Sequence, residues 1–341
     1  MSSLQVVANQ PLKNLNTFGF DVSAEFFVRT SSDDELREAV EFAKQRSKPL
    51  FILGGGSNLV LTRNIPGLTA MQQHQLIEIE AENDEAVLLR ASAAVNWHRL
   101  VLFCVERGFY GLENLSLIPG TAGAAPIQNI GAYGVELADV LSHVEALEIA
   151  TGKKIILQNA DCEFAYRESI FKAKHRNQFI ITDIYLRLGK VKRFNLQYAA
   201  LARELDNISP ESLTLETVSA AVCRIRQSKL PSPETIGNAG SFFKNPVLDT
   251  EQLRSIQHIY PDLPAHEQQD KSWKVPAAWL LETAGWKGHR DLDVGVHQRQ
   301  ALVLVNYGKG NGTAIIDLAE KIQADIAKKF GVSLEIEPVV I

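Results

Sequence analysis

Two loops of small residues have the composition to bind a large polar ligand. GGGSN, at residues 54–58, follows an apolar run, and its consecutive backbone N–H groups can converge on a pyrophosphate. IPGTAGAAPIQNIGAYG, at residues 118–134, has no charged residue, and its small side chains let a flat ring system approach the backbone closely. A tight turn would also explain the first loop, and a buried crossing between sheets would explain the second. Together the two loops favour one large dinucleotide-like ligand.

A lone serine stands in a third segment, NAGSFFKNP at residues 238–246. A serine in such surroundings commonly caps a turn or faces solvent. No histidine lies nearby in the sequence to act as a base, so Ser241 is not expected to be a nucleophile. A hydroxyl of such high pKa would suit only the transfer of a proton to a strongly basic acceptor, such as an enolate.

Several common catalytic and metal-binding motifs are absent. The sequence has no HExxH, Walker A loop, GxSxG elbow or GxGxxG that opens a helix, and we interpret GKGNG at residues 308–312 as a turn. Cys104, Cys162 and Cys223 are spaced about sixty residues apart without a CxxC pair. We therefore expect no disulfide framework and no metal site, and we expect a reducing, cytoplasmic compartment.

Charge and hydropathy exclude two classes of partner. Lys and Arg total 35 against 40 Asp and Glu, so the net charge of −5 gives no general basic field for nucleic acid. The uncharged stretch Asn114–Val135 is long enough to span a bilayer, but it contains two prolines and four glycines. We predict a buried irregular loop there, no membrane partner, and no signal peptide at the N-terminus.

The elements that must position these residues alternate along the chain. The first half is rich in strands: we expect a capping box at Ser32 and Glu35 that starts a helix, and a buried strand at Leu50–Leu53 before the glycine loop. Asn96 is expected to cap a helix that stops at Gly108. Further strands are expected at Glu85–Ser92 and Phe179–Leu188, with a hairpin at Val144–Asn159 that turns at Thr151-Gly152.

The second half is more helical. The periodicity predicts helices at Glu216–Gln227, Thr250–Ile259, Ala277–Thr283 and Thr313–Phe330, with strands at Ala301–Asn306 and Val332–Ile341. Pro231, Pro233 and Gly237 mark a junction near the change in character. The expected fold class is α+β.

The motifs in combination resemble one enzyme family. They are NTFG (16–19), LGGGSN (53–58), the uncharged loop, FAYRESIF (164–171), KLPSP (229–233), NAGSFFKNP and VHQRQALVLVN (296–306), and they occur in order over residues 16–337. This set resembles the UDP-N-acetylenolpyruvoylglucosamine reductases, in particular their type I branch. The resemblance implies a two-lobed FAD-binding half of the vanillyl-alcohol-oxidase type and a smaller α+β substrate-binding domain.

The same resemblance implies domain limits and cofactor contacts. The lobes would span 1–66 and 67–212, with FAD bound by about residues 21–191; the substrate domain would span 213–331, and 332–341 would be a terminal strand. The residues expected to contact FAD are Gly54, Gly55, Gly56, Ser57, Asn58, Gly120, Thr121, Gly123, Ala124, Asn129, Gly131, Ala132 and Ile181. Some relatives carry hydroxyls where this chain has Ala124 and Ala125, so one neutral hydrogen bond, worth about 1 kcal/mol, would be missing.

The implied reaction has two halves. NADPH would reduce the flavin, and the enolpyruvyl substrate would then take a hydride at C3 to give UDP-N-acetylmuramate for peptidoglycan. Arg167 would hold the substrate carboxylate as a planar fork, Glu337 would assist it, and Ser241 would protonate C2 of the enolate. Arg167 could instead pair with a neighbouring glutamate, and Glu337 could be an exposed residue, since Pro338 removes a ladder donor and favours an edge position.

Further residues would bind the rest of the substrate. Arg226 and Lys229 would contact its diphosphate, although both would also fit a solvated helix end. The resemblance implies that Tyr198 closes over the uridine diphosphate and that Asn245 and Gln300 donate or accept hydrogen bonds. We expect a monomer. Two other classes of protein compete with this interpretation: an oxidase of the same flavin fold, and a non-catalytic protein that binds flavin or a nucleotide sugar.

Overall fold

The computed structural model describes residues 4–268 and 270–341. Its residues group into two units. The first contains the residues up to Gln10, Ala24–Gly56 and Ile65–Ser228, and the second contains Pro11–Ser23, Ser57–Asn64 and Lys229–Ile341. This division differs from the expected limits at 66, 212 and 331: nearly all of the helix that starts at Leu215 belongs to the first unit, and Pro11–Ser23 and Ser57–Asn64 belong to the second.

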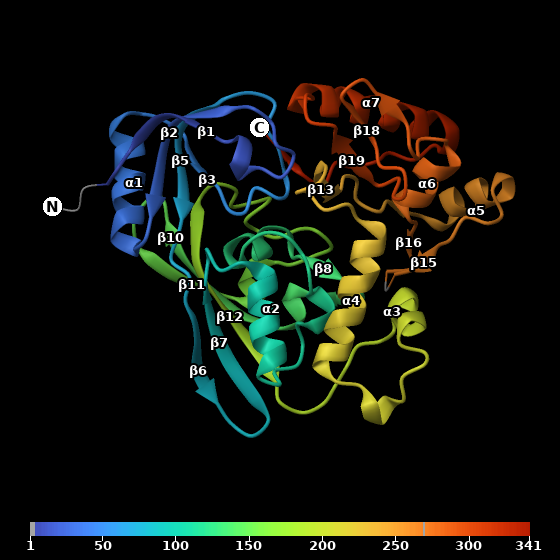
Figure 1. Cartoon of the computed structure of the whole chain (residues 1–341), viewed down its shortest axis with the longest axis horizontal. Helices are drawn as coiled ribbons and strands as arrows, with labels where there is room; N and C mark the ends of the chain where they lie inside the picture. Colours follow the sequence, from blue (N-terminus) through green and yellow to red (C-terminus); the bar gives the residue numbers. More distant parts are fainter. Residues whose placement is uncertain (1–3, 269) are drawn as a thin grey trace. The chain divides into compact units, whose positions relative to one another are not determined.

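A five-stranded antiparallel sheet forms the centre of the first unit. Its order is β11 (Lys154–Gln158), β10 (Leu141–Glu148), β12 (Phe179–Gly189), β7 (Ala86–Ser92) and β6 (Ile77–Glu82). One face packs against helix α2 (Trp97–Glu106), which Asn96 caps by accepting from the Arg99 N–H (Figure 1). The expected strands, hairpin and helix of this region are confirmed.

A second sheet in the first unit is mainly parallel and lies against helix α1 (Asp33–Gln45). Its order is β1 (Val7–Pro11), β2 (Ser23–Thr30), β5 (Ile65–Gln72) and β3 (Leu50–Ile52). Ala39 and Ala43 of α1 pack on this sheet, whereas Leu36 and Val40 also contact β10 and β12. The apolar stripe of α1 therefore joins both sheets into one unit.

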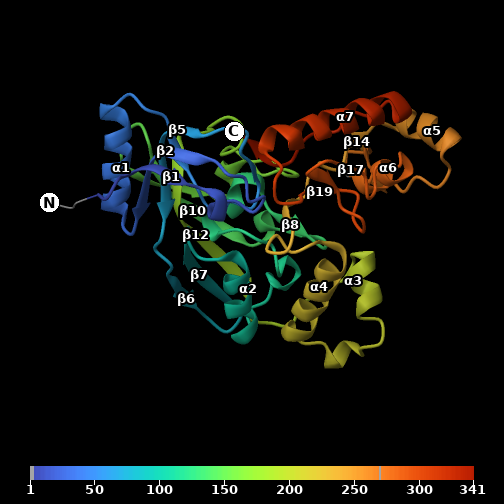
Figure 2. The ribbon, with the colours of Figure 1, turned by 45° about the horizontal axis from the view of Figure 1, so that its top comes forward.

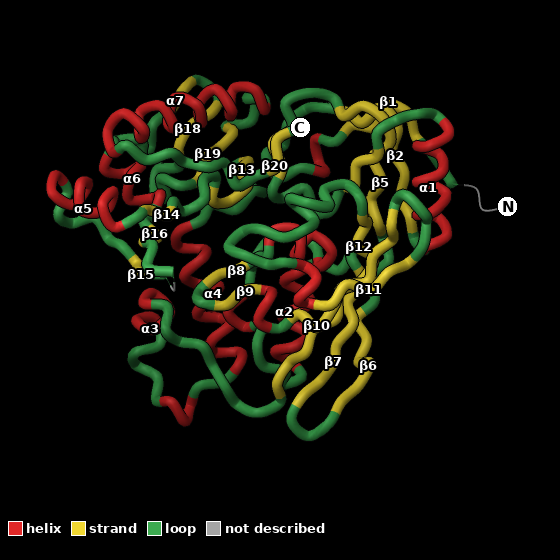
Figure 3. The backbone as a smooth tube through the Cα atoms, turned by 180° about the vertical axis from the view of Figure 1, so that it is seen from behind, coloured by secondary structure: helices red, strands yellow, loops and turns green. Residues whose placement is uncertain are grey.

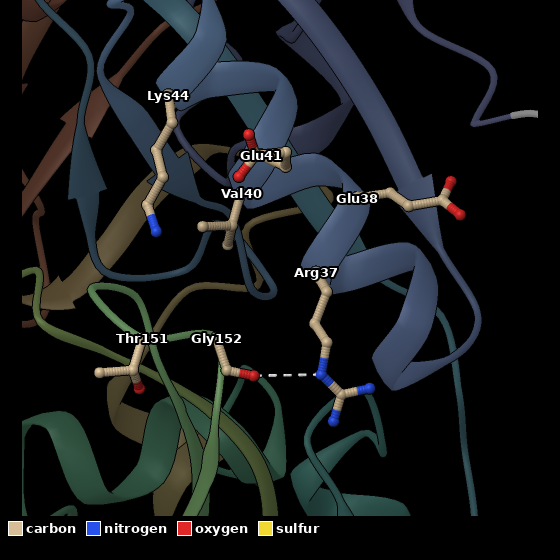
Figure 4. A pocket seen from close by; sticks show the side chains of 7 residues that line it. All are labelled: Arg37, Glu38, Val40, Glu41, Lys44, Thr151 and Gly152. Carbon is tan, nitrogen blue, oxygen red and sulfur yellow. Dashed lines mark hydrogen bonds between the residues drawn. The ribbon is translucent and has the colours of Figure 1, made fainter.

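Two cations of α1 add polar contacts to the neighbouring hairpin. The Arg37 Nε donates to the carbonyl of Gly152 at 3.1 Å (Figure 4). The Lys44 Nζ donates to the carbonyl of Ala150 at 3.0 Å. The shallow hollow between α1 and this turn is thus bridged by hydrogen bonds that help to fix the helix on the sheet.

The uncharged stretch is irregular, as expected, and its residues are mostly half-buried or buried. It contains a short 3₁₀ helix, Ala122–Gln128, and a small ribbon of β8 (Gly131–Ala132) and β9 (Val135–Glu136). Helices α3 (Ala199–Glu204) and α4 (Leu215–Lys229) lie side by side and share an apolar cluster (Figure 2). Within the described residues, no helix is long and apolar enough to cross a membrane.

The second unit is built on the sheet β13 (Gly237–Ser241), β19 (Val303–Asn306), β18 (Val294–Val296) and β17 (Arg290–Asp291). Helices α5 (Thr250–Ile259), α6 (Ala277–Thr283) and α7 (Gly312–Phe330) confirm the expected helices, and Asn311 caps α7 (Figure 2). A small sheet has the order β14 (Val247–Leu248), β16 (Trp273–Lys274), β15 (His266–Glu267). Short 3₁₀ turns across the chain lie at Lys13–Leu15, Glu113–Leu115, Leu137–Asp139, Asn159–Cys162 and Pro210–Ser212.

The expected long strand at Val332–Ile341 is wrong. Only β20 (Val339–Val340) is a regular strand, and it pairs in parallel with β4 (Leu59–Val60) of the same unit (Figure 3). Before it, Ile336 forms an isolated bridge with Phe243. The segment changes partner along its length, and therefore cannot extend one continuous ladder.

Candidate active site

The glycine loop and the uncharged loop touch through their backbones. A methyl group on Gly55 would lie 2.9 Å from the Cα of Gly120, and one on Gly54 would lie 3.1 Å from the Thr121 Oγ1. Gly56 has a φ of 64°, in the left-handed region that favours glycine. The two loops predicted from composition thus form one cradle, in which the backbone at Gly55 leaves no room for a side chain.

Contacts with Ala93, just after β7, and with Trp97, at the start of α2, shape the uncharged loop. The Trp97 backbone N–H donates to the Gly120 carbonyl at 3.1 Å, and its indole N–H donates to the Leu115 carbonyl at 2.9 Å. Further along, the Gly123 N–H donates to the Ala93 carbonyl, and a methyl group on Gly123 would lie 2.5 Å from the Ala93 Cβ. Close contact with the sheet therefore determines the course of the loop.

Two of the expected cofactor residues use their polar groups inside the protein. The Asn129 amide donates to the Glu136 Oε2 at 2.7 Å, and its oxygen accepts from the Ala138 N–H at 3.0 Å. The Ile181 carbonyl accepts from the Gln72 Nε2 at 2.9 Å. Asn129 is buried, and its side-chain amide is used to hold this loop.

Arg167 lies at a tight turn beside the uncharged loop. Its backbone is left-handed, with a φ of 58°, and its guanidinium donates to the Gly131 carbonyl at 2.8 Å. Among the neighbouring carboxylates, Glu168 lies 3.8 Å from Lys172, and Glu163 lies 3.4 Å from Lys174. The turn thus directs the guanidinium of Arg167 onto the loop expected to bind flavin.

Arg226, near the end of α4, reaches the uncharged loop and does not lie at a solvated helix end. Its Nε is buried without a hydrogen-bond partner, and its guanidinium interacts with the Tyr133 hydroxyl. Burial lowers the pKa of Arg226, and the charge of Arg167 lowers it further, although Tyr133 acts in the opposite direction. Lys229, by contrast, is exposed. The two guanidiniums create a local positive field that favours an anionic ligand group.

Tyr133 is a residue of this site that sequence reasoning missed. It has a φ of 52°, lies between Ala132 and Gly134, and contacts the ring of Tyr198 edge-on at 5.2 Å between centroids. Tyr198 itself is 45% exposed. The only signal in the sequence was a large aromatic residue in a loop of otherwise small residues.

Ser241 and Glu337 lie on neighbouring segments of the second unit. The Glu337 N–H donates at 2.9 Å to the carbonyl of Phe242, the residue after Ser241. The next backbone N–H along this segment, that of Val339, donates to the Asn58 carbonyl at 3.0 Å, so the segment has a different partner from this point. Pro338 is buried between these two donors and directly precedes β20, a strand of a two-stranded sheet, so its missing N–H interrupts neither hydrogen bond.

Two other expected substrate residues, Asn245 and Gln300, accept hydrogen bonds from backbone N–H groups of the second unit. The Asn245 Oδ1 accepts from the Ala277 N–H at 3.0 Å at the start of α6, and the Gln300 Oε1 accepts from the Leu302 N–H at 3.4 Å. Lys244, which is 7% exposed, forms an ion pair of 2.5 Å with Glu335. These contacts fix the loops on either side of Ser241 and Glu337.

Burial acts on the thiols of Cys104, Cys162 and Cys223. All three are free, and burial raises the pKa of Cys162 to about 12 and that of Cys104 further above its ordinary value. No cluster of histidine, cysteine, aspartate or glutamate suited to a metal ion occurs among the residues that the structure describes.

The fold and the double-loop cradle define the class as an FAD-binding protein of the vanillyl-alcohol-oxidase type. Residues 24–157 match the family model of an FAD binding domain. A solvent-stable cholesterol oxidase shares the fold, with a TM-score of 0.53 and 13% identity over 98% of this chain and 87% of the oxidase.

The particular family follows from the second half and from the full length. Residues 231–341 match the C-terminal domain of UDP-N-acetylenolpyruvoylglucosamine reductase. Reductases of that name from Pseudomonas fluorescens Pf0-1 and Amoebophilus asiaticus 5a2 are 46% and 45% identical, over 98% and 96% of this chain and 99% and 97% of their own lengths. The crystal structure of the Thermus caldophilus reductase has a TM-score of 0.69 at 22% identity, covering 100% of this chain and 99% of that one. The chain belongs to the UDP-N-acetylenolpyruvoylglucosamine reductase family.

Proposed function

We propose that this protein reduces UDP-N-acetylglucosamine enolpyruvate to UDP-N-acetylmuramate, using NADPH and FAD, in peptidoglycan synthesis. The observation that carries the proposal is the likeness to reductases of this name over 98% of the chain. The cradle of Gly55 and Gly120 supports the cofactor, because its exposed backbone groups suit a pyrophosphate.

The residues that would hold FAD come from both loops. Gly54–Asn58 would contact the pyrophosphate, and Gly120, Thr121, Gly123, Ala124, Gly131 and Ala132 would line the flavin with the backbone of Asn129. Ile181 would lie near the adenine. Bound FAD supplies the capacity to accept a hydride from NADPH and pass it to the substrate.

The chain's own residues would stabilise charge and deliver a proton. A hydride added at C3 of the substrate places negative charge on C2 and the carboxylate as an enolate. Arg167 would bind that carboxylate with its planar fork, with Glu337 assisting, and Ser241 would give its proton to C2. A positioned general acid contributes roughly 10²–10⁴-fold to such a step.

The finer substrate contacts complete the proposal. Arg226 and Lys229 would neutralise the diphosphate, Tyr198 would close over the uridine end, and Asn245 and Gln300 would orient the substrate. We place the enzyme in the cytoplasm as a monomer. The odd number of cysteines without a CxxC pair supports a reducing compartment.

An anaerobic absorbance experiment tests the function. The purified protein is loaded with FAD and treated first with NADPH and then with the enolpyruvyl UDP-sugar. Bleaching of the flavin band by NADPH and its return with substrate, without oxygen, is the expected result. A band that returns only when oxygen is admitted would indicate an oxidase, and a protein that never acquires a flavin band would be a binding protein without this chemistry.

A further inference from the structure

A histidine at the start of α2 contacts the uncharged loop at a strained point. The His98 Nδ1 accepts a hydrogen bond from the Leu117 N–H at 3.0 Å. Leu117 has a φ of 59°, a left-handed conformation that a leucine rarely adopts. Such a backbone persists only when its surroundings hold it, and His98 supplies the acceptor for its N–H.

The contact belongs to a series along the loop. Trp97, the residue before His98, binds the loop at Leu115 with its indole and at Gly120 with its backbone. His98 fixes the midpoint between these two bonds. Gly120, at the end of the series, is the residue whose Cα faces Gly55 in the cradle. Leu117 is three residues before Gly120, so a change in the backbone conformation of Leu117 would shift the cradle.

The hydrogen bond defines the protonation state of the ring. Because Nδ1 accepts, the single proton of the neutral imidazole lies on Nε2, and protonation of Nδ1 would remove the acceptor. Burial lowers the pKa of His98, and the charge of Arg226 on α4 lowers it further. Of the other charged groups near the ring, Arg99 donates to Gln75, and Glu113 accepts from the Gly111 N–H.

We propose that His98 is a positioning residue for the cofactor: its neutral imidazole holds Leu117 in the left-handed conformation and so keeps Gly120 against Gly55. This inference rests on the proposed function, since it assumes that the cradle binds FAD. It concerns a residue that contacts the loop rather than the reacting atoms.

The test compares two substitutions at one position by titrating FAD into the apoprotein and following flavin fluorescence. In His98→Asn, the Oδ1 occupies the same place along the side chain as Nδ1 and can accept from Leu117, whereas His98→Ala cannot. We expect FAD to bind about tenfold more weakly to the Ala variant and within about threefold of wild type to the Asn variant. Arg99→Ala, an exposed change on the same helix, is the matched control and is expected to bind normally.

A pH series on wild type supplies a second readout that does not depend on the Ala variant folding. Because the pKa of His98 is lowered, FAD affinity of wild type should fall as the pH drops further below the ordinary histidine pKa of about 6.5. The Asn variant, which has no group to titrate there, should lose clearly less affinity over the same range. Equal affinities in the Ala and Asn variants, or equal pH dependence in wild type and the Asn variant, would overturn the proposal. Absence of FAD binding by wild type would instead overturn the proposed function, and this inference with it.

Discussion

At the scale of residues, the two arginines near the uncharged loop are placed by different means. Arg167 is held at a strained turn and bonds the Gly131 carbonyl, whereas Arg226 reaches the loop from a helix and keeps a buried Nε without a partner. A buried donor without an acceptor is costly in the free protein. An anionic ligand group would remove that cost, which is why Arg226 remains a good candidate for substrate binding.

Substitution of Ser241 should separate the two halves of the proposed reaction. In Ser241→Ala, reduction of the flavin by NADPH should stay within about twofold of wild type, while reoxidation by the enolpyruvyl substrate should slow by at least about 10²-fold. The reason is that only the second half needs a proton at C2. Stopped-flow absorbance measures each half, and equal impairment of both would refute the role of Ser241 as proton donor.

Substitution of the substrate cations should affect binding more than chemistry. We expect Lys229→Ala and Arg226→Ala to raise KM by roughly tenfold with a smaller change in kcat, since a diphosphate contact is made equally before and during the reaction. Arg224→Ala, an exposed change on the same helix, is the control. A large fall in kcat at unchanged KM would contradict this assignment.

At the scale of elements, the site depends on loops that neighbouring elements press into shape. The Gly54–Gly56 loop follows β3, and the uncharged loop is bound to the start of α2 and to Ala93 after β7. In the second unit, the segment before β20 is fixed by backbone bonds on both sides and by the ion pair of Lys244 with Glu335. The loops themselves contain little regular structure, so their contacts with neighbouring helices and strands set the geometry of the site.

The glycine positions can be ranked from these contacts. In Gly55→Ala the new methyl group would meet the backbone of Gly120, which cannot move independently, so FAD should bind at least about tenfold more weakly, a change of ~1.4 kcal/mol. In Gly54→Ala the neighbour is the Thr121 hydroxyl, which can rotate away, so the loss should be smaller. Fluorescence titration with FAD compares the two, and an equal or reversed order would disprove the close approach.

At the scale of the whole molecule, a charge network links helix α1 to the five-stranded sheet of the first unit. Lys154 of β11 contacts Asp33 of α1, Glu145 of β10 and the buried Asp183 of β12 at 3.0, 2.8 and 3.6 Å. Burial disfavours its ammonium, but the hydrogen bonds to Glu145 and Asp33 and the charge of Asp183 outweigh it and raise the pKa of Lys154. The stability of this unit therefore depends on pH in the alkaline range.

The direction of that dependence follows from the raised pKa. The stabilisation is complete below the unfolded-state pKa of about 10.4 and is lost as the pH rises through the higher folded-state pKa. Lys154→Met should lower Tm by roughly 2–4 °C at pH 7, a modest change because the ammonium is partly exposed. The Tm difference from wild type should shrink above about pH 10.5. Thermal melting of wild type, Lys154→Met and the exposed-site control Lys153→Met measures this, and a difference that grows with pH would contradict it.

Local patterns in the sequence determined most of the elements. The capped starts of α1 and α2, the helices α5 and α6 and the hairpin of β10 and β11 all follow from neighbouring residues, because capping and amphipathic periodicity act within a few positions. The two loops with their glycines, and the motifs at Arg167 and Ser241, could also be recognised, since their unusual composition is itself local.

Only the tertiary structure decided which distant groups meet. The parallel pairing of β2, β5 and β3 was not predicted, because the hydrogen bonds of parallel strands join segments far apart in the chain. The burial of the Arg226 Nε beside Tyr133, the internal use of the Asn129 amide, and the change of partner at Pro338 depend likewise on distant neighbours. Sequence composition therefore determined what chemistry this protein could carry, and long-range packing decided how each polar group is used.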